Sequence, residues 1–367
     1  MAITSFQTGT ITLNAAAPND LSDTATLGAT VTQGNSILLA SVRGGSNAVS
    51  QYNVTAVLSS DGTTVTAQRP TNGSEIIVDF MVVEASEFNV QHFEVTRASN
   101  GIVNQAITSV DTDYAFPICT GLRATGSSRS SDDFTSIEIT TSTNVELYVA
   151  SASSVTTAFQ IVEMSSAEIA SLQVVTTTLA AIQNNVTITS VDPDKSLIFA
   201  SAGQAGGNVP NRQIPIFSLT SATNFRLEAA THANPSMTVI AYIVEFVNLG
   251  VTNTVTNGIV GTTTTEVLGG APTYGGALIN GLYIRCGTAP ENDDDSLEIL
   301  FTASLSGSTW TFERGASTTN ANISYSVFDW ADIFSSSGVT PVPPKLQGLN
   351  SQFATIIAHR LGGVLEQ

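Results

Sequence analysis

Alternating apolar and polar residues recur in four segments of the chain, and each of these segments ends in the same way. Each closes at an acidic residue, and these acids lie 79, 82 and 84 residues apart, at Glu84, Glu163, Glu245 and Asp329. An aromatic residue stands three or four positions before each acid, at Phe80, Phe159, Tyr242 and Tyr325. Because side chains alternate between the two faces of a strand, this pattern predicts a closing strand with one face in a core.

Two further anchors precede each closing strand in the same order. The nearer one has an apolar residue, a short polar turn and a second apolar residue, which is Val65, Val145, Phe225 or Trp310. It predicts a β-hairpin. The farther anchor is a polar turn before an apolar run; in VDPDKSLIFASA the turn is Asp192 to Lys195, where Pro presets a dihedral and Asp can bond its own backbone.

Three anchors repeated four times predict an all-β fold of tandem units. We expect four small antiparallel β-sandwich domains of about six strands, each with its own core rather than one continuous core. The expected boundaries are 1–86, 87–165, 166–248 and 249–331. Polar loops of variable sequence separate the two anchors, and such loops are a common place for binding.

The last 36 residues, 332–367, do not follow the repeat. SSSGVTPVPPKLQGLN has the composition of a linker, and the segment after it predicts a short helix that begins at Ser351 and ends before Gly362. Its apolar face would hold the candidate assembly residues Phe353, Ile356, Ile357 and Leu361. A helix this short needs a partner in water. That partner is either its own fourth domain or a neighbouring protein.

Composition narrows the function classes. Only 11 % of the residues are charged, and 30 acidic against 12 basic residues give a net charge of -18, which excludes binding to a phosphate backbone. The N-terminal sequence lacks a basic and an apolar signal region, and no apolar run reaches 18 residues. We therefore expect synthesis in the cytoplasm, without Sec export or a membrane span. Cys119 and Cys286 are expected to be buried thiols in different repeats.

Few residues suit catalysis or metal binding. His92, His232 and His359 have no metal-ligand spacing, and no nucleophile elbow, P-loop or dinucleotide fingerprint is present. The acidic run Asp293, Asp294 and Asp295 is a candidate cation site, and Asp132 with Asp133 is a second acidic pair. Either loop could be solvated, could hold a cation or could carry a carboxylate pair for glycoside hydrolysis. We expect no enzyme activity and no cofactor.

The recurring acids have a structural and a functional interpretation. Because all four repeats have one at the same place, we expect each acid to satisfy a fixed backbone donor, or a cation, within the scaffold. The aromatic residues before them are expected in the core. Exposed aromatic residues such as Tyr52 or Tyr274 could instead stack on a glycan.

The run VDPDKSLIFASA, followed by LTSATNFRLEA and TVIAYIVEF, resembles a tandem β-sandwich repeat of tailed-phage and prophage virion proteins of the fibre or spike type. In that repeat the closing strand tends to read W-Q-V-V-E-F. The repeat is similar to H-type lectin modules, which are six-stranded sandwiches that often trimerise and bind sugars. Residues 166–248 carry the resemblance best. No repeat has the Trp, and no sugar-binding residue is carried over.

The resemblance implies a structural component of a phage-like virion: a fibre, spike, collar or capsid-decoration protein that contacts other virion proteins. It also implies a homo-oligomer, for which a trimer is one candidate. A contact with host surface glycan is a further expectation. A glycan-binding adhesin for receptor recognition is the alternative, and a polysaccharide depolymerase is a further one.

Overall fold

The structure is a computed structural model that describes residues 3–14, 21–44, 54–70, 75–98, 100–124, 134–150, 154–179, 181–204, 215–229, 237–259, 261–280, 301–315 and 321–334. The chain divides into two units, Met1–Ser335 and Ser336–Gln367. All described residues belong to the first unit. They are 69 % β-strand and only 4 % helical, which confirms the all-β prediction.

The described residues of each repeat form six strands, named A to F here in chain order. In the first repeat they are β1 (Ile3–Leu13), β2 (Ser22–Thr26), β3 (Ser36–Gly44), β4 (Thr55–Leu58), β5 (Thr64–Gln68) and β6 (Ile76–Ala85). In the second they are β7 (Asn89–Arg97), β8 (Gly101–Ala106), β9 (Ala115–Ala124), β10 (Thr135–Thr141), β11 (Asn144–Val149) and β12 (Val155–Glu163).

The third and fourth repeats follow the same order. The third has β13 (Ile169–Leu179), β14 (Gln183–Thr187), β15 (Ser196–Gln204), β16 (Ile216–Ser221), β17 (Asn224–Glu228) and β18 (Met237–Phe246). The fourth has β19 (Val251–Ile259), β20 (Thr263–Val267), β21 (Gly275–Ile279), β22 (Phe301–Ser306), β23 (Thr309–Arg314) and β24 (Ala321–Asp329).

The six strands of a repeat form two antiparallel sheets of three. Strand F lies between A and C in one sheet, the AFC sheet, and strand E lies between B and D in the other, the BED sheet. The predicted hairpins are strands D and E, and their predicted apolar residues are buried: Val65, Val145, Phe225 and Trp310. The predicted turn at Asp192 is the 3-10 helix η4 (Pro193–Lys195), where the Asp192 side chain accepts from the Asp194 amide.

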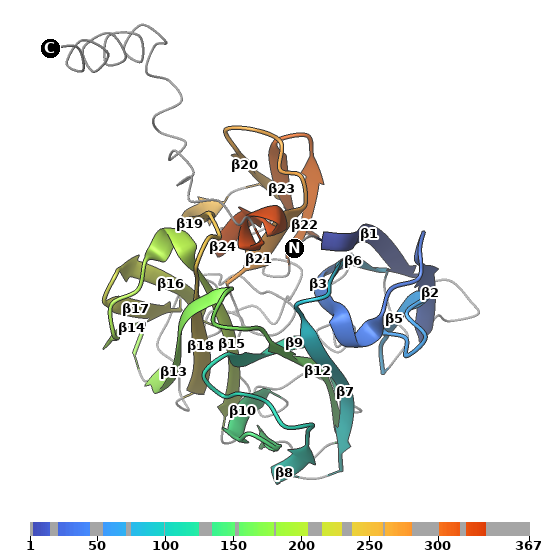
Figure 1. Cartoon of the computed structure of the whole chain (residues 1–367), viewed down its shortest axis with the longest axis horizontal. Helices are drawn as coiled ribbons and strands as arrows, with labels where there is room; N and C mark the ends of the chain where they lie inside the picture. The colour runs from blue at the N-terminus through green and yellow to red at the C-terminus, as the bar shows by residue number, and fades with distance from the viewer. Residues whose placement is uncertain are drawn as a thin grey trace, which may run out of the picture. The chain divides into compact units, whose positions relative to one another are not determined.

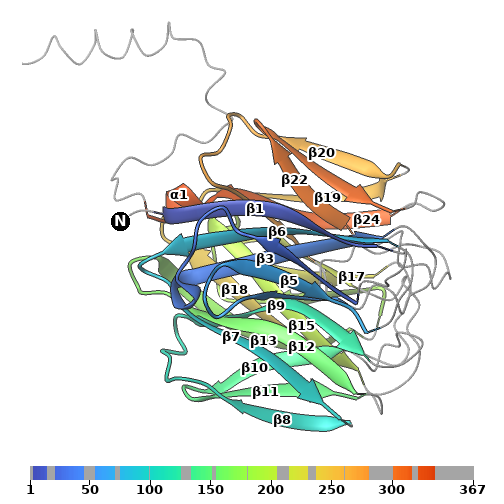
Figure 2. The same cartoon turned by 90° about the vertical axis from the view of Figure 1, so that its right-hand side faces the viewer.

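The four sandwiches of the unit Met1–Ser335 are arranged in a ring, with the fourth against the first (Figure 1). Their strands run side by side when this unit is seen from the side (Figure 2). One buried cluster joins apolar side chains from all four repeats, for example Ile37, Phe116, Phe199 and Trp330. The described buried apolar residues fall into several clusters and not one continuous core, and one cluster lies within the second repeat. The two largest clusters nevertheless cross repeat boundaries, because the outward faces of the AFC sheets are themselves apolar.

The fourth strand F runs into a short helix, α1 (Trp330–Ile333). Asp329 is its N-cap and accepts from the Ala331 amide. Trp330 packs edge-on against Phe328 and Phe88, and its indole N–H donates to Met81 Sδ in the first repeat at 3.4 Å. No helix in the described ranges is both long and apolar enough to cross a membrane.

Candidate functional site

Contacts between successive repeats bring the chain's polar side chains together. We name the contact of strand D of one repeat with the AFC sheet of the next repeat a seam. There are four seams, 1→2, 2→3, 3→4 and 4→1, and all run in the same sense. Because strand D is the edge of its BED sheet, it presents backbone N–H and C=O groups that need partners.

The same position of strand C meets that edge in every seam. It lies opposite the fifth residue before the recurring acid, and it is Ser41, Gly121, Ser201 or Asn280. Ser201 Oγ accepts from the Ile137 amide at 2.9 Å, and Ser41 Oγ accepts from the Ala303 amide at 3.3 Å.

Seams 3→4 and 1→2 use backbone at this position. The Asn280 carbonyl accepts from the Phe217 amide at 2.9 Å. Gly121 pairs directly with Thr55, which joins two sheets into one of six strands. Gly121 has φ +144°, and a Cβ there would lie 2.1 Å from the Val54 carbonyl oxygen, so this approach requires glycine.

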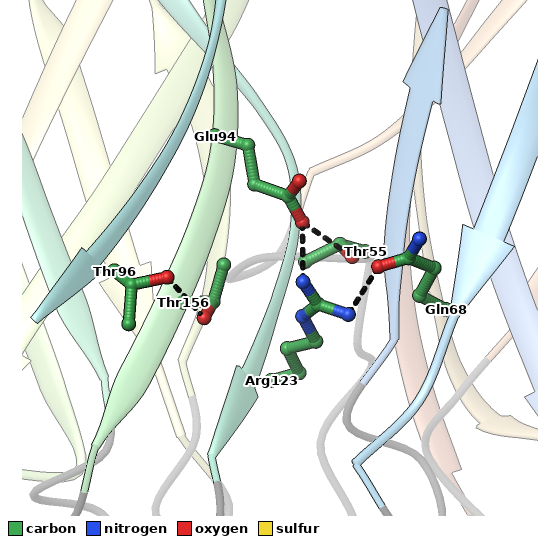
Figure 3. A network of polar contacts seen from close by, with 6 residues as sticks. All are labelled: Thr55, Gln68, Glu94, Thr96, Arg123 and Thr156. Carbon is green, nitrogen blue, oxygen red and sulfur yellow. Dashed lines mark hydrogen bonds and ion pairs between the residues drawn. The ribbon is translucent and has the colours of Figure 1, made fainter. Parts of the chain in front are cut away.

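A second seam position, two residues further along strand C, gives each seam different chemistry. In seam 4→1 Arg43 Nη1 lies 2.7 Å from Glu313 Oε1. In seam 1→2 Arg123 donates to Gln68 and pairs with Glu94 at 2.8 Å, and Glu94 also accepts from Thr55 (Figure 3). Thr96 and Thr156 form a hydroxyl pair beside this network (Figure 3).

The same position is uncharged in seam 2→3. Gly203 stands where the other two seams have arginine, and Tyr148 stands opposite it. A Cβ on residue 203 would lie 2.9 Å from Tyr148 Cδ1. Each of these three seams therefore has its own matched pair, and an arginine at residue 203 would have no room.

A third seam position lies on strand F, three residues before the acid. Gln160 is fully buried, and its amide accepts from the Leu38 N–H at 3.1 Å and donates to the Leu38 carbonyl at 2.6 Å. Tyr242 OH accepts from the Ile139 amide at 2.8 Å, and burial raises its pKa far above the ordinary value. Met81 receives the Trp330 indole N–H. These side chains hold the second repeat to the first, the third to the second and the first to the fourth.

The aromatic residues before the acids are buried, but one differs from the other three. Phe80, Phe159 and Tyr325 stand four residues before the acid and face the interior of their own sandwich. Tyr325 stacks on Phe312 at 4.1 Å, and burial with its hydrogen bond to Glu266 raises its pKa to about 12. Tyr242 stands three residues before the acid and so faces the neighbouring repeat.

The recurring acids accept hydrogen bonds from the turn before strand C. Glu84 accepts from the Thr32 amide at 2.7 Å, Glu163 from Asp111 at 2.6 Å, and Glu245 from Asp192 at 3.0 Å. Asp329 accepts from the Thr273 and Tyr274 amides. These are the hydrogen bonds that the acids would make if each one is a scaffold group that satisfies a fixed backbone donor.

Sequence reasoning missed three glutamines of strand A. Gln7, Gln91 and Gln173 each donate to and accept from one backbone residue of the connection between strands B and C, which is Ala29, Thr108 or Thr189. All three lie opposite the second residue before the acid. The sequence signal that could have found them is a glutamine at the same position of strand A in three repeats.

Several predicted site residues lie outside the described residues. They are the candidate cation ligands Asp293, Asp294 and Asp295, the pair Asp132 and Asp133, Cys286, His232, His359, Tyr52 and the assembly residues Phe353, Ile356, Ile357 and Leu361. Cys119 is half-buried in β9, and its thiol lies 3.6 Å from the Ala158 carbonyl. Tyr274 is half-buried against Phe6.

His92 belongs to seam 1→2. Its Nε2 lies 3.0 Å from the Ser36 carbonyl and 3.2 Å from the Gln33 carbonyl, so this nitrogen must carry the hydrogen. Burial lowers the pKa of the imidazole, while the two carbonyls oppose that shift. Within the described ranges, no three His, Cys, Asp or Glu residues are grouped as a metal site would require.

A cavity of about 290 Å³ lies in seam 4→1. Strands A, C and F of the first repeat form one wall, and strands C, D and E of the fourth repeat form the other. We name it the seam cavity. No protein-family model and no curated protein matches this chain.

Proposed function

We propose that this chain is a structural component of a phage-like virion, built as a closed ring and without enzyme activity. The observation that carries the proposal is the fourth seam: Ala303 in β22 docks on Ser41 in β3 with the same geometry that joins successive repeats. One chain thus makes an assembly of the kind that separate subunits make when head-to-tail contacts close. The resemblance of residues 166–248 to virion repeats supports the same assignment.

The ring is suited to a load-bearing or attachment role. Its strand D edges, which would otherwise pair with further chains, are occupied by the seams. We propose that copies of the chain associate in the particle, and with other virion proteins, as preformed rings. The segment 336–367, with its predicted apolar helix face, is the proposed point of attachment.

Particle purification tests the proposal. A tagged full-length chain should copurify with particles at a fixed copy number and be visible at a repeated position by electron microscopy. A chain ending at Ser335 should melt at the same temperature but should be incorporated less. Absence of the full-length chain from purified particles would contradict the virion assignment, and unchanged incorporation of the shorter chain would contradict the attachment role.

The alternative of a glycan-binding adhesin is favoured by one observation, the seam cavity. Glycan binding in this cavity would be compatible with a virion component that also contacts the host surface. For the depolymerase alternative, the test is incubation of purified protein with host polysaccharide. Chains that shorten over time would contradict the proposed lack of enzyme activity.

A further inference from the structure

The four seams alternate between two classes of contact. In seams 1→2 and 3→4 the backbone of strand D is paired directly with backbone of the next repeat, at Gly121 and at the Asn280 carbonyl. In seams 2→3 and 4→1 the hydroxyl of Ser201 or Ser41 stands between the two strands. A hydroxyl can turn with its side chain, whereas a backbone pair is fixed by both strands. The second class therefore permits more movement between repeats.

Strand A shows the same alternation. The residue opposite the third position before the acid is His92 in the second repeat and Asn253 in the fourth. His92 bonds to two carbonyls in the turn of the preceding repeat, and Asn253 Nδ2 donates to the Pro193 carbonyl at 2.6 Å. The equivalent residues of the other two seams, Thr8 and Val174, are exposed instead. Strand A is thus held to the preceding turn in seams 1→2 and 3→4.

The first residue of strand C explains which turns can be held in this way. It is a buried serine in the first and third repeats and Ala or Gly in the other two: Ser36, Ser196, Ala115 and Gly275. The Ser36 hydroxyl donates to the Thr32 carbonyl at 2.8 Å and closes a 3-10 helix, η1 (Gln33–Asn35). The Ser196 hydroxyl donates to the Asp192 carbonyl at 2.7 Å and closes η4. Ala and Gly lack this hydroxyl, and the described turns before them contain no 3-10 helix. The ring therefore consists of two similar halves, repeats one with two and repeats three with four.

Seam 4→1 is the weaker of the two seams between these halves. It joins the ends of the repeat array, so no short peptide connection spans it. In seam 2→3 the Tyr242 hydroxyl accepts from the Ile139 amide, but the equivalent pair in seam 4→1 is Met81 and Leu305, which lacks that hydroxyl. The seam cavity of about 290 Å³ lies here, against about 30 Å³ for the pocket that borders seam 2→3. Unfilled volume weakens a contact.

The helix α1 holds seam 4→1 at one end. Trp330 lies edge-on to Phe88 at 6.1 Å, and Phe334 lies 5.5 Å from the same ring. The Trp330 indole N–H donates to Met81 Sδ, which is a weak acceptor. We name Trp330 and Phe334 the latch. The latch follows the last strand of the fourth repeat and contacts the first repeat and its connection to the second, so it belongs to one half and grips the other.

We infer that the ring is gated: it opens at seam 4→1, where the latch parts from Phe88 and Met81, while its two halves turn about seam 2→3. Seams 1→2 and 3→4 stay closed, because backbone contacts and the bonds of His92 and Asn253 hold them. The closed ring is the resting state, in which Trp330 is 1 % exposed. Opening frees the N–H and C=O groups at the edge of β22. This inference goes beyond the proposed function and does not depend on the virion assignment.

Four matched spin-label pairs test the inference in the full-length chain. One exposed residue of strand B lies opposite the same position of strand E in every repeat: Thr24, Asn104, Asn185 and Thr265. Cysteines introduced at two of these positions at a time, in a chain with Cys119→Ala and Cys286→Ala, carry nitroxide labels across one seam. Pulsed electron-spin resonance then gives the distribution of distances. We expect one narrow distribution across seams 1→2 and 3→4, a broader one across seam 2→3, and an additional longer component across seam 4→1.

Variants of the latch and of the seam serines separate gating from general loosening. Trp330→Leu should increase the longer component across seam 4→1 several-fold and leave seams 1→2 and 3→4 narrow. Ser41→Ala, which removes the partner of the Ala303 amide, should act in the same direction, whereas the matched Ser201→Ala should broaden seam 2→3. Equal widths across all four seams in the parent chain and in these variants would overturn the inference. A broadening by Trp330→Leu that is shared equally by all four seams would overturn it too.

Discussion

Arg43 and Glu313 are 270 residues apart in the chain, yet Arg43 Nη1 lies 2.7 Å from Glu313 Oε1. Arg123 and Gln68 occupy the equivalent positions in seam 1→2, the next seam around the ring. A contact between the ends of the repeat array therefore has the same geometry as a contact between neighbours, which is what makes the array a ring.

Reversing the charge at Arg43 tests this closing contact. Arg43→Glu should lower the free energy of unfolding by about 1 kcal/mol or less, because both side chains are partly exposed. Adding Glu313→Arg should restore most of the loss in urea unfolding. Arg226→Glu, which breaks a pair within one repeat, should gain nothing from Glu313→Arg. A double variant no better than Arg43→Glu would contradict the contact.

Gly121→Ala should be among the most destabilising single substitutions. The new Cβ would meet backbone of β4 and force β4 away from β9, which should cost more than about 3 kcal/mol in a denaturant titration. Gly307→Ala is the control, since Gly307 also has positive φ but has nothing within 4 Å of its Cβ position. It should lose only about 1–2 kcal/mol. Equal losses would mean that strain, and not the seam, explains Gly121.

Gln160→Met should loosen seam 1→2 without changing the size of the side chain much. It removes two hydrogen bonds and leaves the Leu38 N–H and C=O without partners, at a cost of about 2–4 kcal/mol. Gln183→Met, at an exposed position of β14, should stay within about 0.5 kcal/mol of wild type. Thermal or urea unfolding of both variants measures the difference, and similar values would contradict a role for Gln160 in the seam.

His92 should make the stability of the ring depend on pH. Its folded-state pKa lies below the ordinary value of 6.5, so the unfolded chain binds the proton more readily. Stability is full above pH 6.5 and falls as pH decreases through that window, by at most about 1.4 kcal/mol per pH unit. His92→Gln keeps a donor but does not titrate, and should show a smaller slope between pH 7.5 and 5.5. Equal slopes would exclude His92 as the cause.

Glu245 distinguishes a scaffold acid from a cation ligand. Glu245→Gln keeps an acceptor for the Asp192 amide and a partner for Ser171, so it should lose less than about 0.5 kcal/mol. Glu245→Ala should lose about 1 kcal/mol. Neither EDTA nor added Ca²⁺ should move the melting temperature. A rise with Ca²⁺ that Glu245→Gln abolishes would instead identify a cation site.

The period, the hairpins and the turn at Asp192 could be predicted from sequence because each depends on local chemistry. Apolar alternation, turn residues and an Asp that bonds its own backbone all act over a few residues. The acid at each strand end could be interpreted as part of the scaffold because it occurs at the same place in all four repeats.

The seams could not be predicted because their contacts involve backbone groups and small hydroxyls. Ser41 and Ser201 look like any other serine in a strand, and Gly121 resembles a simple irregularity. Tyr242 shows the second difficulty. A shift of one residue relative to Phe80 moves it from the inside of its sandwich to the neighbouring repeat, and a pattern that allows three or four positions hides that change.

Closure also limits how this gene can change. An open stack of repeats tolerates the duplication or deletion of one unit, because only a terminal contact is moved. Here a fifth copy would have to be inserted between a strand D and the Ser, Gly or Asn of strand C that it contacts. The rotation angles between successive sandwiches would then no longer add up to a full circle. The number of repeats should therefore stay at four. Related chains should differ in the sequences of their repeats and not in the number of repeats.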